Sequence, residues 1–343
     1  MDVAGLPRYF IILLLTLIAV SISGQPDGRE VVARKGDGIH KLLKDHGLDP
    51  AGYTEIFIEL NNGNIGRNNS LYAGRKYLIP EAATQTSGSV GSTGSENYPV
   101  REYAIFRKNY SSVEITGNDL SGTVYYLMSG HGGPDPGASG KYGANTLTED
   151  EYAYDVTLRL ARNLIQHGAL VYLITRDDND GIRDQSILKV DSDEKCYPSA
   201  VIPVNQMARL RQRTNAVNRL SAQHKGNYQR LIVLHLDSRS TGENIDVFFY
   251  HHGNSRSGKQ LADNIHNTFR EKYRRFQPNR SYRGTVTTRS GLYVVRNTDP
   301  PTVFIELGNI SNARDQLRFV LYDNRQAMAN WITEGIITDY INR

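Results

Sequence analysis

Strand-like and helix-like patterns alternate along the chain between residues 98 and 343. Short runs of apolar, β-branched and aromatic residues predict strands at residues 123–127, 170–174, 231–236, 245–250 and 302–306. Longer stretches with apolar residues three or four positions apart predict helices at residues 149–167, 206–223, 259–273 and 324–340. This alternation predicts an α/β domain with a mostly parallel, twisted sheet that is flanked by helices.

A shorter block, residues 30–80, has a pattern of its own. A short apolar strand is followed by two helical runs, which begin near Ile39 and Thr54, and by a second strand that ends at Pro80. This pattern predicts a small α+β module. Residues 81–97 are rich in Ser, Thr and Gly and lack apolar periodicity, so we expect a flexible linker between the module and the domain at 98–343.

The first 24 residues differ from the rest of the chain. Arg8 precedes the apolar run at residues 9–20, and the small residues SISG follow it. A run this short is typical of a secretory signal peptide, with an uncleaved anchor as the alternative. We therefore expect residues 1–24 to be a signal peptide, and the mature protein to be exported and to have no stable membrane span.

Charge and cysteine content narrow the class of protein. The formal net charge is +4 at pH 7, which is far from the concentrated basic stripe of a nucleic-acid-binding protein. We expect no nucleic-acid partner. Cys196 is the sole cysteine, so the chain cannot form an internal disulfide and must depend on its core.

Two histidines and two glutamates stand near the ends of predicted strands. His131 lies in the glycine-rich loop LMSGHGGPDPGASG after the first strand, Glu149 begins the next helix, and His235 and Glu306 end two later apolar runs. Because the carboxyl ends of parallel strands meet at one edge of a sheet, we expect these side chains to converge there. Two imidazoles and one carboxylate could bind zinc beside an open position for water, and the other carboxylate could be a general base.

Each of these residues also has a plainer interpretation. His131 alone could be a loop residue that only terminates the strand. Thr148 and Glu151 have the spacing of a capping box, which predicts that Glu151 satisfies the start of the helix. Glu149 would then remain available to point back over the strand ends.

Other polar features are interpreted more conservatively. The run DDNDG at residues 177–181 resembles half of a calcium loop, but Arg176 and Ile187 occupy positions that need acidic ligands. We interpret it as a turn, with a weak cation site as the alternative. His251 and His252 follow a predicted strand and are interpreted as a solvated strand end, with contact to substrate or metal as the alternative.

Taken in order, the motifs of residues 122–340 resemble the zinc-dependent N-acetylmuramoyl-L-alanine amidases of the amidase 3 family. The resemblance is carried by HGGPDPGA at His131, by the helix that opens with Glu149, by RTNAVN at Arg213, by His235, and by VFIELGN at Val303. The segment at residues 180–207 is longer than the family pattern, and we interpret it as a surface loop, with a lid or regulatory insertion as the alternative.

The resemblance implies that His131, Glu149 and His235 bind Zn²⁺ and that Glu306 is the catalytic carboxylate. It implies a hydrolase that cleaves the amide between the lactyl group of N-acetylmuramic acid and the L-alanine of the stem peptide of peptidoglycan. Such a protein would be periplasmic or associated with the cell wall of a bacterium. Two alternatives remain: a non-catalytic wall-binding scaffold, and a zinc peptidase that acts within the stem peptide.

The block at residues 30–80 resembles a LysM module. The resemblance is carried by Val31 with the Gly-Asp pair that follows it, by Asn61 and Asn62 in the middle, and by LYAGRKYLIP at residues 71–80. It implies binding to glycan strands that contain N-acetylglucosamine. The alternative is a small packing domain with no specific affinity for glycan.

Overall fold

The computed structural model describes residues 28–34, 36–48, 50–66, 70–80, 98–107, 109–238 and 243–343. The predicted signal peptide (1–24) and the predicted linker (81–97) lie outside these ranges. The chain divides into two compact units, Met1–Val90 and Gly91–Arg343. Within the described ranges, no helix combines the length and the apolar character needed to cross a bilayer.

The smaller unit has the predicted order of strand, two helices and strand. Its elements are β1 (Gly28–Val32), α1 (Ile39–Asp45), α2 (Pro50–Leu60) and β2 (Lys76–Pro80), and β1 pairs with β2 in the antiparallel sense. Side chains from all four elements and their connections form a separate small core around Leu43, Phe57 and Tyr77. Asn61, which is buried, donates to the carbonyls of Phe57 (2.8 Å) and Leu78 (2.7 Å) and so joins the end of α2 to β2.

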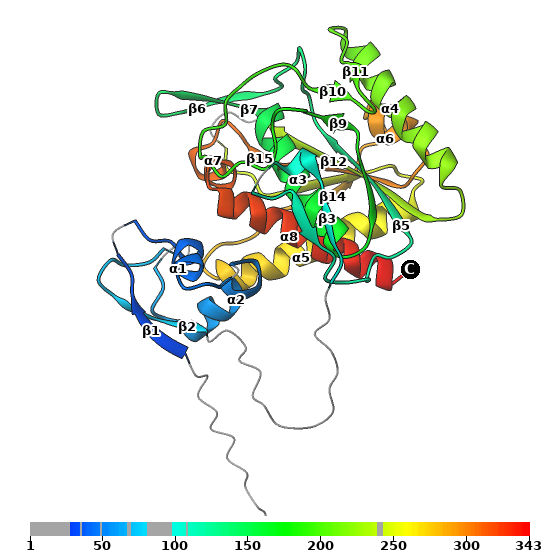
Figure 1. The fold of residues 1–343 in the computed structure, drawn as a ribbon. Coiled ribbons are helices and arrows are strands. Elements are labelled where there is room, and N and C mark those ends of the chain that lie inside the picture. Colours follow the sequence, from blue (N-terminus) through cyan, green and yellow to red (C-terminus); the bar gives the residue numbers. More distant parts are fainter. Residues whose placement is uncertain are drawn as a thin grey trace, which may run out of the picture. The chain divides into compact units, whose positions relative to one another are not determined.

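The larger unit is built on a six-stranded sheet, which confirms the predicted α/β class (Figure 1). The strand order is β14-β13-β15-β12-β5-β8, and every pair is parallel except β13 with β15. The strands are β5 (Thr123–Ser129), β8 (Leu170–Leu173), β12 (Tyr228–Asp237), β13 (Phe248–His251), β14 (Thr285–Thr288) and β15 (Thr302–Asn309).

All four predicted helices are present, and two short ones were missed by sequence analysis. The predicted helices are α3 (Glu149–Gln166), α4 (Gln206–Gln223), α5 (Arg256–Phe276) and α8 (Tyr322–Ile341). The missed ones are α6 (Tyr293–Asn297) and α7 (Ala313–Val320). Short antiparallel pieces complete the unit: β3 (Val100–Glu102) with β4 (Ser112–Glu114), β6 (Ser139–Tyr142) with β7 (Asn145–Thr148), and β9 (Thr175–Arg176) with β10 (Lys195–Cys196) and β11 (Ala200–Val201).

Strand β13 begins three positions later than predicted. The backbone of Ile245 does not enter the sheet, because its N–H donates to the Asp315 carboxylate (3.0 Å) and its carbonyl accepts from Arg318 (2.9 Å). These two side chains come from α7, a helix that the sequence did not reveal. A side-chain partner of this kind replaces the sheet hydrogen bonds that the apolar pattern alone predicts.

Both faces of the central sheet are covered, which explains the continuous apolar character of its strands. Successive side chains of a strand point to opposite faces. Ile232 and Leu234 therefore pack with α3, α5 and α8 on one face, while Leu231 and Val233 pack with α4 and α6 on the other. Helices α5 and α8 lie side by side beneath the sheet in Figure 1.

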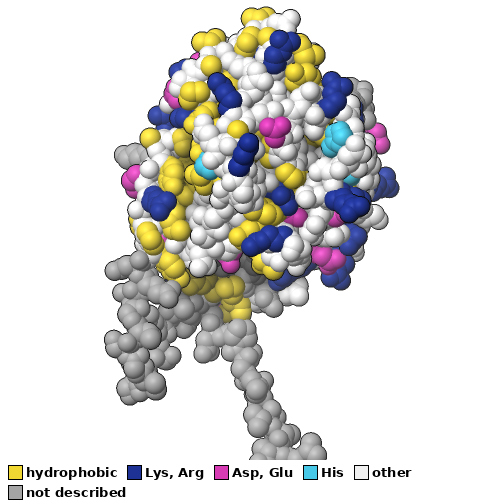
Figure 2. Space-filling model, turned by 90° about the vertical axis from the view of Figure 1, so that its right-hand side faces the viewer, with side chains coloured by type: hydrophobic (Ala, Val, Ile, Leu, Met, Phe, Trp, Pro, Cys, Tyr) yellow, Lys and Arg dark blue, Asp and Glu magenta, His cyan; other side chains and the backbone are white. Residues whose placement is uncertain are grey.

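Basic and acidic side chains are dispersed on the surface that can be viewed. Figure 2 shows one face of the molecule, on which Lys and Arg side chains lie apart from one another, with Asp, Glu and uncharged side chains between them. The charge on this face is therefore mixed.

A completely buried carboxylate fixes the position of α3. Asp155 accepts hydrogen bonds from Arg159 (2.8 Å), from Arg325 of α8 (2.6 Å) and from the backbone N–H of Arg183 (2.7 Å). The side chains of Asp155 and Arg325 are 0% exposed and that of Arg159 is 1% exposed. Burial by itself raises the pKa of Asp155, but the two guanidinium groups outweigh burial and hold the pKa below its usual range.

The Asp155→Asn variant tests this interaction. It removes the carboxylate that Arg159 and Arg325 share and leaves Arg159 only its exposed partner Asp184 (3.1 Å), so we expect the free energy of unfolding to fall by about 3–5 kcal/mol. Urea unfolding followed by the fluorescence of Trp331, the sole tryptophan, reports on this unit alone. The control is Asp263→Asn, which removes an exposed pair with Lys259 and should change the midpoint little. Equal midpoints for the two variants would contradict the assignment.

Candidate metal centre

The loop that carries His131 has a left-handed backbone. His131 has a φ of 57°, and the two residues after it, Gly132 and Gly133, have φ values of 95° and 63°. Only glycine adopts these values freely, and a histidine that does so is uncommon and is typical of functional sites. The glycine-rich sequence thus lets the chain turn sharply after β5 and direct the imidazole back toward α3.

His235 lies at an irregularity in the central strand. The pairing of β12 with β15 shifts register between His235 and Asp237, which indicates a β-bulge. Bulges re-aim side chains and are frequent beside active sites. The ring of Phe304 stacks on the His235 ring, with centroids 4.4 Å apart and planes 18° apart, and so fixes its orientation.

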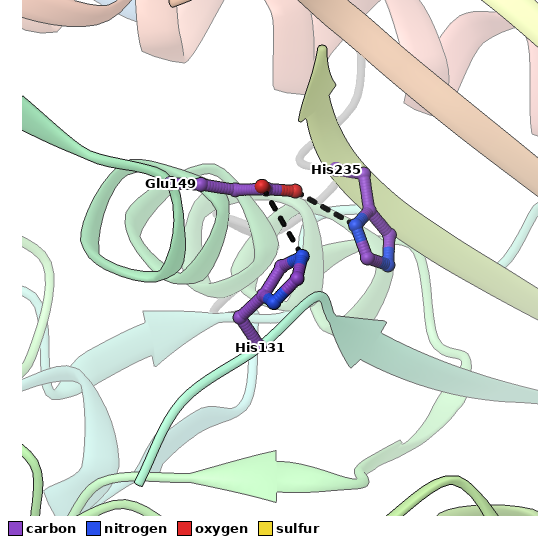
Figure 3. A group of neighbouring side chains, drawn as sticks. All are labelled: His131, Glu149 and His235. Atoms are coloured by element: carbon purple, nitrogen blue, oxygen red, sulfur yellow. Dashed lines mark hydrogen bonds and ion pairs between the residues drawn. The ribbon is translucent and has the colours of Figure 1, made fainter. Parts of the chain in front are cut away.

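Glu149 joins the two histidines (Figure 3). Its Oε1 lies 2.7 Å from Nδ1 of His235, and its Oε2 lies 3.2 Å from Nε2 of His131. The same two oxygens accept from the backbone N–H groups of Leu236 (3.0 Å) and Ala138 (2.9 Å). The three potential ligand atoms all lie within 4.8 Å of one another, as sequence analysis predicted for these residues.

The electrostatics of the group keep Glu149 charged. Burial raises the pKa of Glu149, but the hydrogen bonds and charges of the two imidazoles outweigh burial and hold it well below its usual range. Burial also lowers the pKa of His131, yet the carboxylates of Glu149 and Asp135 outweigh this effect and raise the pKa to about 9. For His235 burial dominates, and its pKa is lowered. An anionic carboxylate therefore stands between two imidazoles.

Two glycines form the wall against which these side chains pack. A Cβ atom on Gly130 would overlap with the ring of His235. A Cβ atom on Gly137 would lie 2.6 Å from the ring of His131 and 2.7 Å from Oε2 of Glu149. Because no side chain occupies this wall, the imidazoles and the carboxylate can approach one another. The donor set and the space fit a zinc ion, which prefers imidazole nitrogen and carboxylate oxygen.

Residues that sequence analysis missed support the loop around His131. The carboxylate of Asp135 lies 2.9 Å from Nδ1 of His131 and 2.5 Å from a guanidinium nitrogen of Arg209. A carboxylate on the second ring nitrogen orients a metal-binding histidine. Glu194 accepts from the backbone N–H of Gly133 (2.6 Å). Asp135 has a local signal, four residues after the histidine, whereas Glu194 is distant in sequence and has none.

Glu306 lies one strand away from the histidine of β12. In the parallel pairing of β12 and β15, Glu306 is the direct partner of His235. It also stands opposite Phe248 of β13, and its side chain is half-buried. The sheet register therefore brings the fourth predicted residue to the same edge, beside the group of three.

Two other predictions are wrong in whole or in part, and the structure also locates Cys196. The capping box is wrong: Thr148 makes no side-chain cap, and Glu151 instead pairs with Arg183 (2.8 Å). Cys196 is buried in the core, and burial raises the pKa of its thiol. His251 is also buried, so the prediction of a solvated strand end is wrong for this residue, whereas His252 is half-exposed. In the part of the chain that the structure describes, neither joins a group of potential metal ligands.

Comparison with known proteins identifies the family. A profile described as N-acetylmuramoyl-L-alanine amidase matches residues 126–338, which is more than half of the chain. The chain is similar to the germination-specific N-acetylmuramoyl-L-alanine amidase of Bacillus subtilis (strain 168), at 25% identity over 64% of this chain and 80% of the relative. It is also similar to the probable cell wall amidase LytH of Staphylococcus aureus, at 26% identity over 64% of this chain and 59% of the relative.

The solved structures to which the chain is similar include AmiC2, an N-acetylmuramoyl-L-alanine amidase of Nostoc punctiforme, at 22% identity and a TM-score of 0.46, covering 66% of this chain and 99% of that one. The catalytic domain of CwlV from Bacillus (Paenibacillus) polymyxa var. colistinus has 22% identity and a TM-score of 0.46, covering 64% and 98%. The profile match and the α/β sheet together show that the protein is a peptidoglycan amidase by class. It belongs to the Amidase_3 family of N-acetylmuramoyl-L-alanine amidases.

The glycine wall gives a direct test of the metal centre. Gly137→Ala places a methyl group against His131 and Glu149, so we expect it to weaken zinc binding by about tenfold or more. Gly143→Ala is the matched control, because Gly143 also has a positive φ (59°) but has open space around it. Zinc affinity measured by competition with a chromophoric chelator should separate the two variants. Equal affinities would show that the wall does not position the ligands.

Proposed function

We propose that the protein is a zinc-dependent amidase that cleaves the bond between the lactyl group of N-acetylmuramic acid and the L-alanine of the stem peptide. The observation that carries this proposal is the group of His131, Glu149 and His235 at the carboxyl edge of the sheet. The group lies inside the range matched by the family profile. Similarity to the named amidases supports the same reaction.

The roles of the residues follow from their surroundings. His131, Glu149 and His235 would hold the metal. When bound, a zinc ion supplies Lewis acidity, which lowers the pKa of water toward about 7 and polarises an amide carbonyl. The anionic state of Glu149 would balance part of the charge of the metal, and its two backbone donors keep the carboxylate in place.

Glu306 is proposed as the general base and acid. It accepts a proton from the attacking water and then donates that proton to the departing amine of L-alanine. Its position next to His235 in the sheet supports this role, because it places a carboxylate at the edge where the predicted ligands meet. Catalysis of this kind contributes about 10²–10⁴-fold to the rate.

The reaction is tested by digestion of purified peptidoglycan, with mass spectrometry of the soluble products. We expect intact stem peptides with a free L-alanine amine, released by the zinc-loaded protein and suppressed by a chelator. Shorter peptides would instead support a zinc peptidase that cuts within the stem. Binding to peptidoglycan without any released product would support a non-catalytic scaffold.

A variant identifies the proton carrier in the same assay. Glu306→Gln should retain zinc, because Glu306 is not one of the three proposed ligands, but should lose turnover by about 10²-fold or more. Glu149→Gln should lose zinc as well as activity. A Glu306→Gln protein with near-normal turnover would exclude Glu306 as the base.

We also propose that the small unit binds glycan as a LysM module does, and that the protein acts in the periplasm or cell wall of a bacterium. The order β1-α1-α2-β2 and the antiparallel pairing of its strands support this proposal. A tethered module raises the local concentration of the enzyme on its substrate without changing the chemistry.

A truncated chain that begins at Tyr98 tests the tether. It should cleave soluble muropeptides at the rate of the full chain but release less product from intact sacculi. Equal activity of the two chains on sacculi would leave the small unit without a role in substrate binding.

A further inference from the structure

A second set of acidic side chains converges on the first turn of α3 from residues 177–194. Its members are Asp150, Glu151, Asp177, Asp180, Asp191 and Glu194. They form three overlapping groups of three, and in each group the carboxylate oxygens lie within 4.8 Å of one another. None of the six is a proposed ligand of the zinc ion.

Most of these carboxylates are buried. Asp150, Glu151 and Asp177 are each 1–2% exposed, and Glu194 is 5% exposed. Crowding of like charges in a buried place is costly unless a cation compensates them or a proton neutralises one of them. Burial and the nearby acidic groups accordingly raise the pKa of Glu194 to about 8.

One arginine compensates only part of this charge. Arg183 pairs with Glu151 (2.8 Å) and with Asp180. The other four members are Asp150, Asp177, Asp191 and Glu194. Within the described ranges, no Lys or Arg side chain forms an ion pair with any of them. In this part of the chain the protein therefore supplies these four carboxylates with no ion pair of their own, and a proton or a bound cation has to compensate their charge.

Two buried oxygens of the cluster have no hydrogen-bond partner in this part of the structure. These are Oδ2 of Asp150 and Oδ1 of Asp191. Asp150 belongs to the group with Glu194 and Glu151, and Asp191 belongs to the other two groups, so both ends of the cluster contain such an oxygen. The other oxygen of Asp150 accepts from the backbone N–H of Glu151 (2.9 Å), so the oxygen without a donor remains for an ordered water or a cation.

We propose that this cluster binds a divalent cation of the calcium type beside Glu194, the residue that shares one group with Asp150 and another with Asp177 and Asp191. Calcium binds six to eight oxygen atoms in flexible geometry and favours carboxylates. Arg183 compensates the charge of the other two members, Glu151 and Asp180, with which it forms ion pairs. The site goes beyond the amidase reaction, because it contains none of the residues to which the reaction is assigned.

The cation would join three segments that are distant in sequence. Asp191 already donates its backbone N–H to Glu151 of α3 (3.0 Å), and Glu194 accepts from Gly133 in the loop of His131. Asp177 accepts from the backbone N–H groups of Asn179 (2.7 Å) and of the following residue (2.8 Å). A bound cation would hold residues 177–194 against the first turn of α3.

The test titrates calcium chloride into the zinc-loaded full-length protein by isothermal calorimetry, in buffer passed over a chelating resin. The resin treatment avoids soluble chelators, which would remove zinc. We expect one calcium ion per chain and a higher unfolding temperature with calcium. Asp191→Asn and Asp177→Asn should each weaken binding by about tenfold or more, because each removes a charged ligand. Zinc content, measured on every sample, verifies that the first site is unchanged.

Asp178→Asn is the matched control. Asp178 lies beside Asp177 in the same turn, but it is exposed and pairs with Lys195, so its variant should bind calcium as the parent does. Without calcium, Asp191→Asn should be at least as stable as the parent, because it removes one of several crowded like charges. A structural role alone would instead make that variant less stable in both conditions.

Two results would overturn the proposal. One is the absence of both heat and stabilisation when calcium is added to the parent protein. The other is unchanged calcium binding in Asp191→Asn and Asp177→Asn. Because the readout is calcium binding and not turnover, these results leave the proposed amidase activity untouched, and loss of amidase activity would leave the calcium result untouched.

Discussion

The position of the site residues depends on one helix, α3, which is held in place by the buried carboxylate of Asp155. Asp155 is held by Arg159, by Arg325 of α8 and by a backbone N–H of residue 183. A carboxylate in this position tolerates no displacement, because each movement would expose uncompensated buried charge. The first turn of α3, which lies six residues earlier, is therefore a fixed base from which Glu149 reaches the strand ends and Asp150 reaches the acidic cluster.

Much of the fold followed from the sequence, because local pattern and topology agree. Five strands of the sheet and four long helices were predicted from periodicity, and the rule for parallel sheets predicted that His131, Glu149 and His235 lie together. Short elements such as α6 and the hairpin of β6 and β7 were missed, since a few residues carry too little periodicity to separate them from loops.

The missed features of the site depend on contacts between distant segments. Asp135 could be suspected from its place in the glycine-rich loop, but Glu194 reaches that loop from outside any local motif. The spacing of Thr148 and Glu151 predicted a capping box. In the structure Glu151 instead forms an ion pair with Arg183, which is distant in sequence. The half calcium loop at residues 177–181 likewise failed as a local pattern, since the carboxylates that group with Asp177 are Asp191 and Glu194, which lie beyond the twelve residues of such a loop.

The bare wall formed by Gly130 and Gly137 also limits how this centre could be re-engineered. A side chain cannot be grafted at either position without displacing His235 or His131, so no substitution there can add a ligand or a polar contact. Redesign has to proceed from positions that already carry a side chain. The backbone in this way limits which residues can stand next to His131, Glu149 and His235.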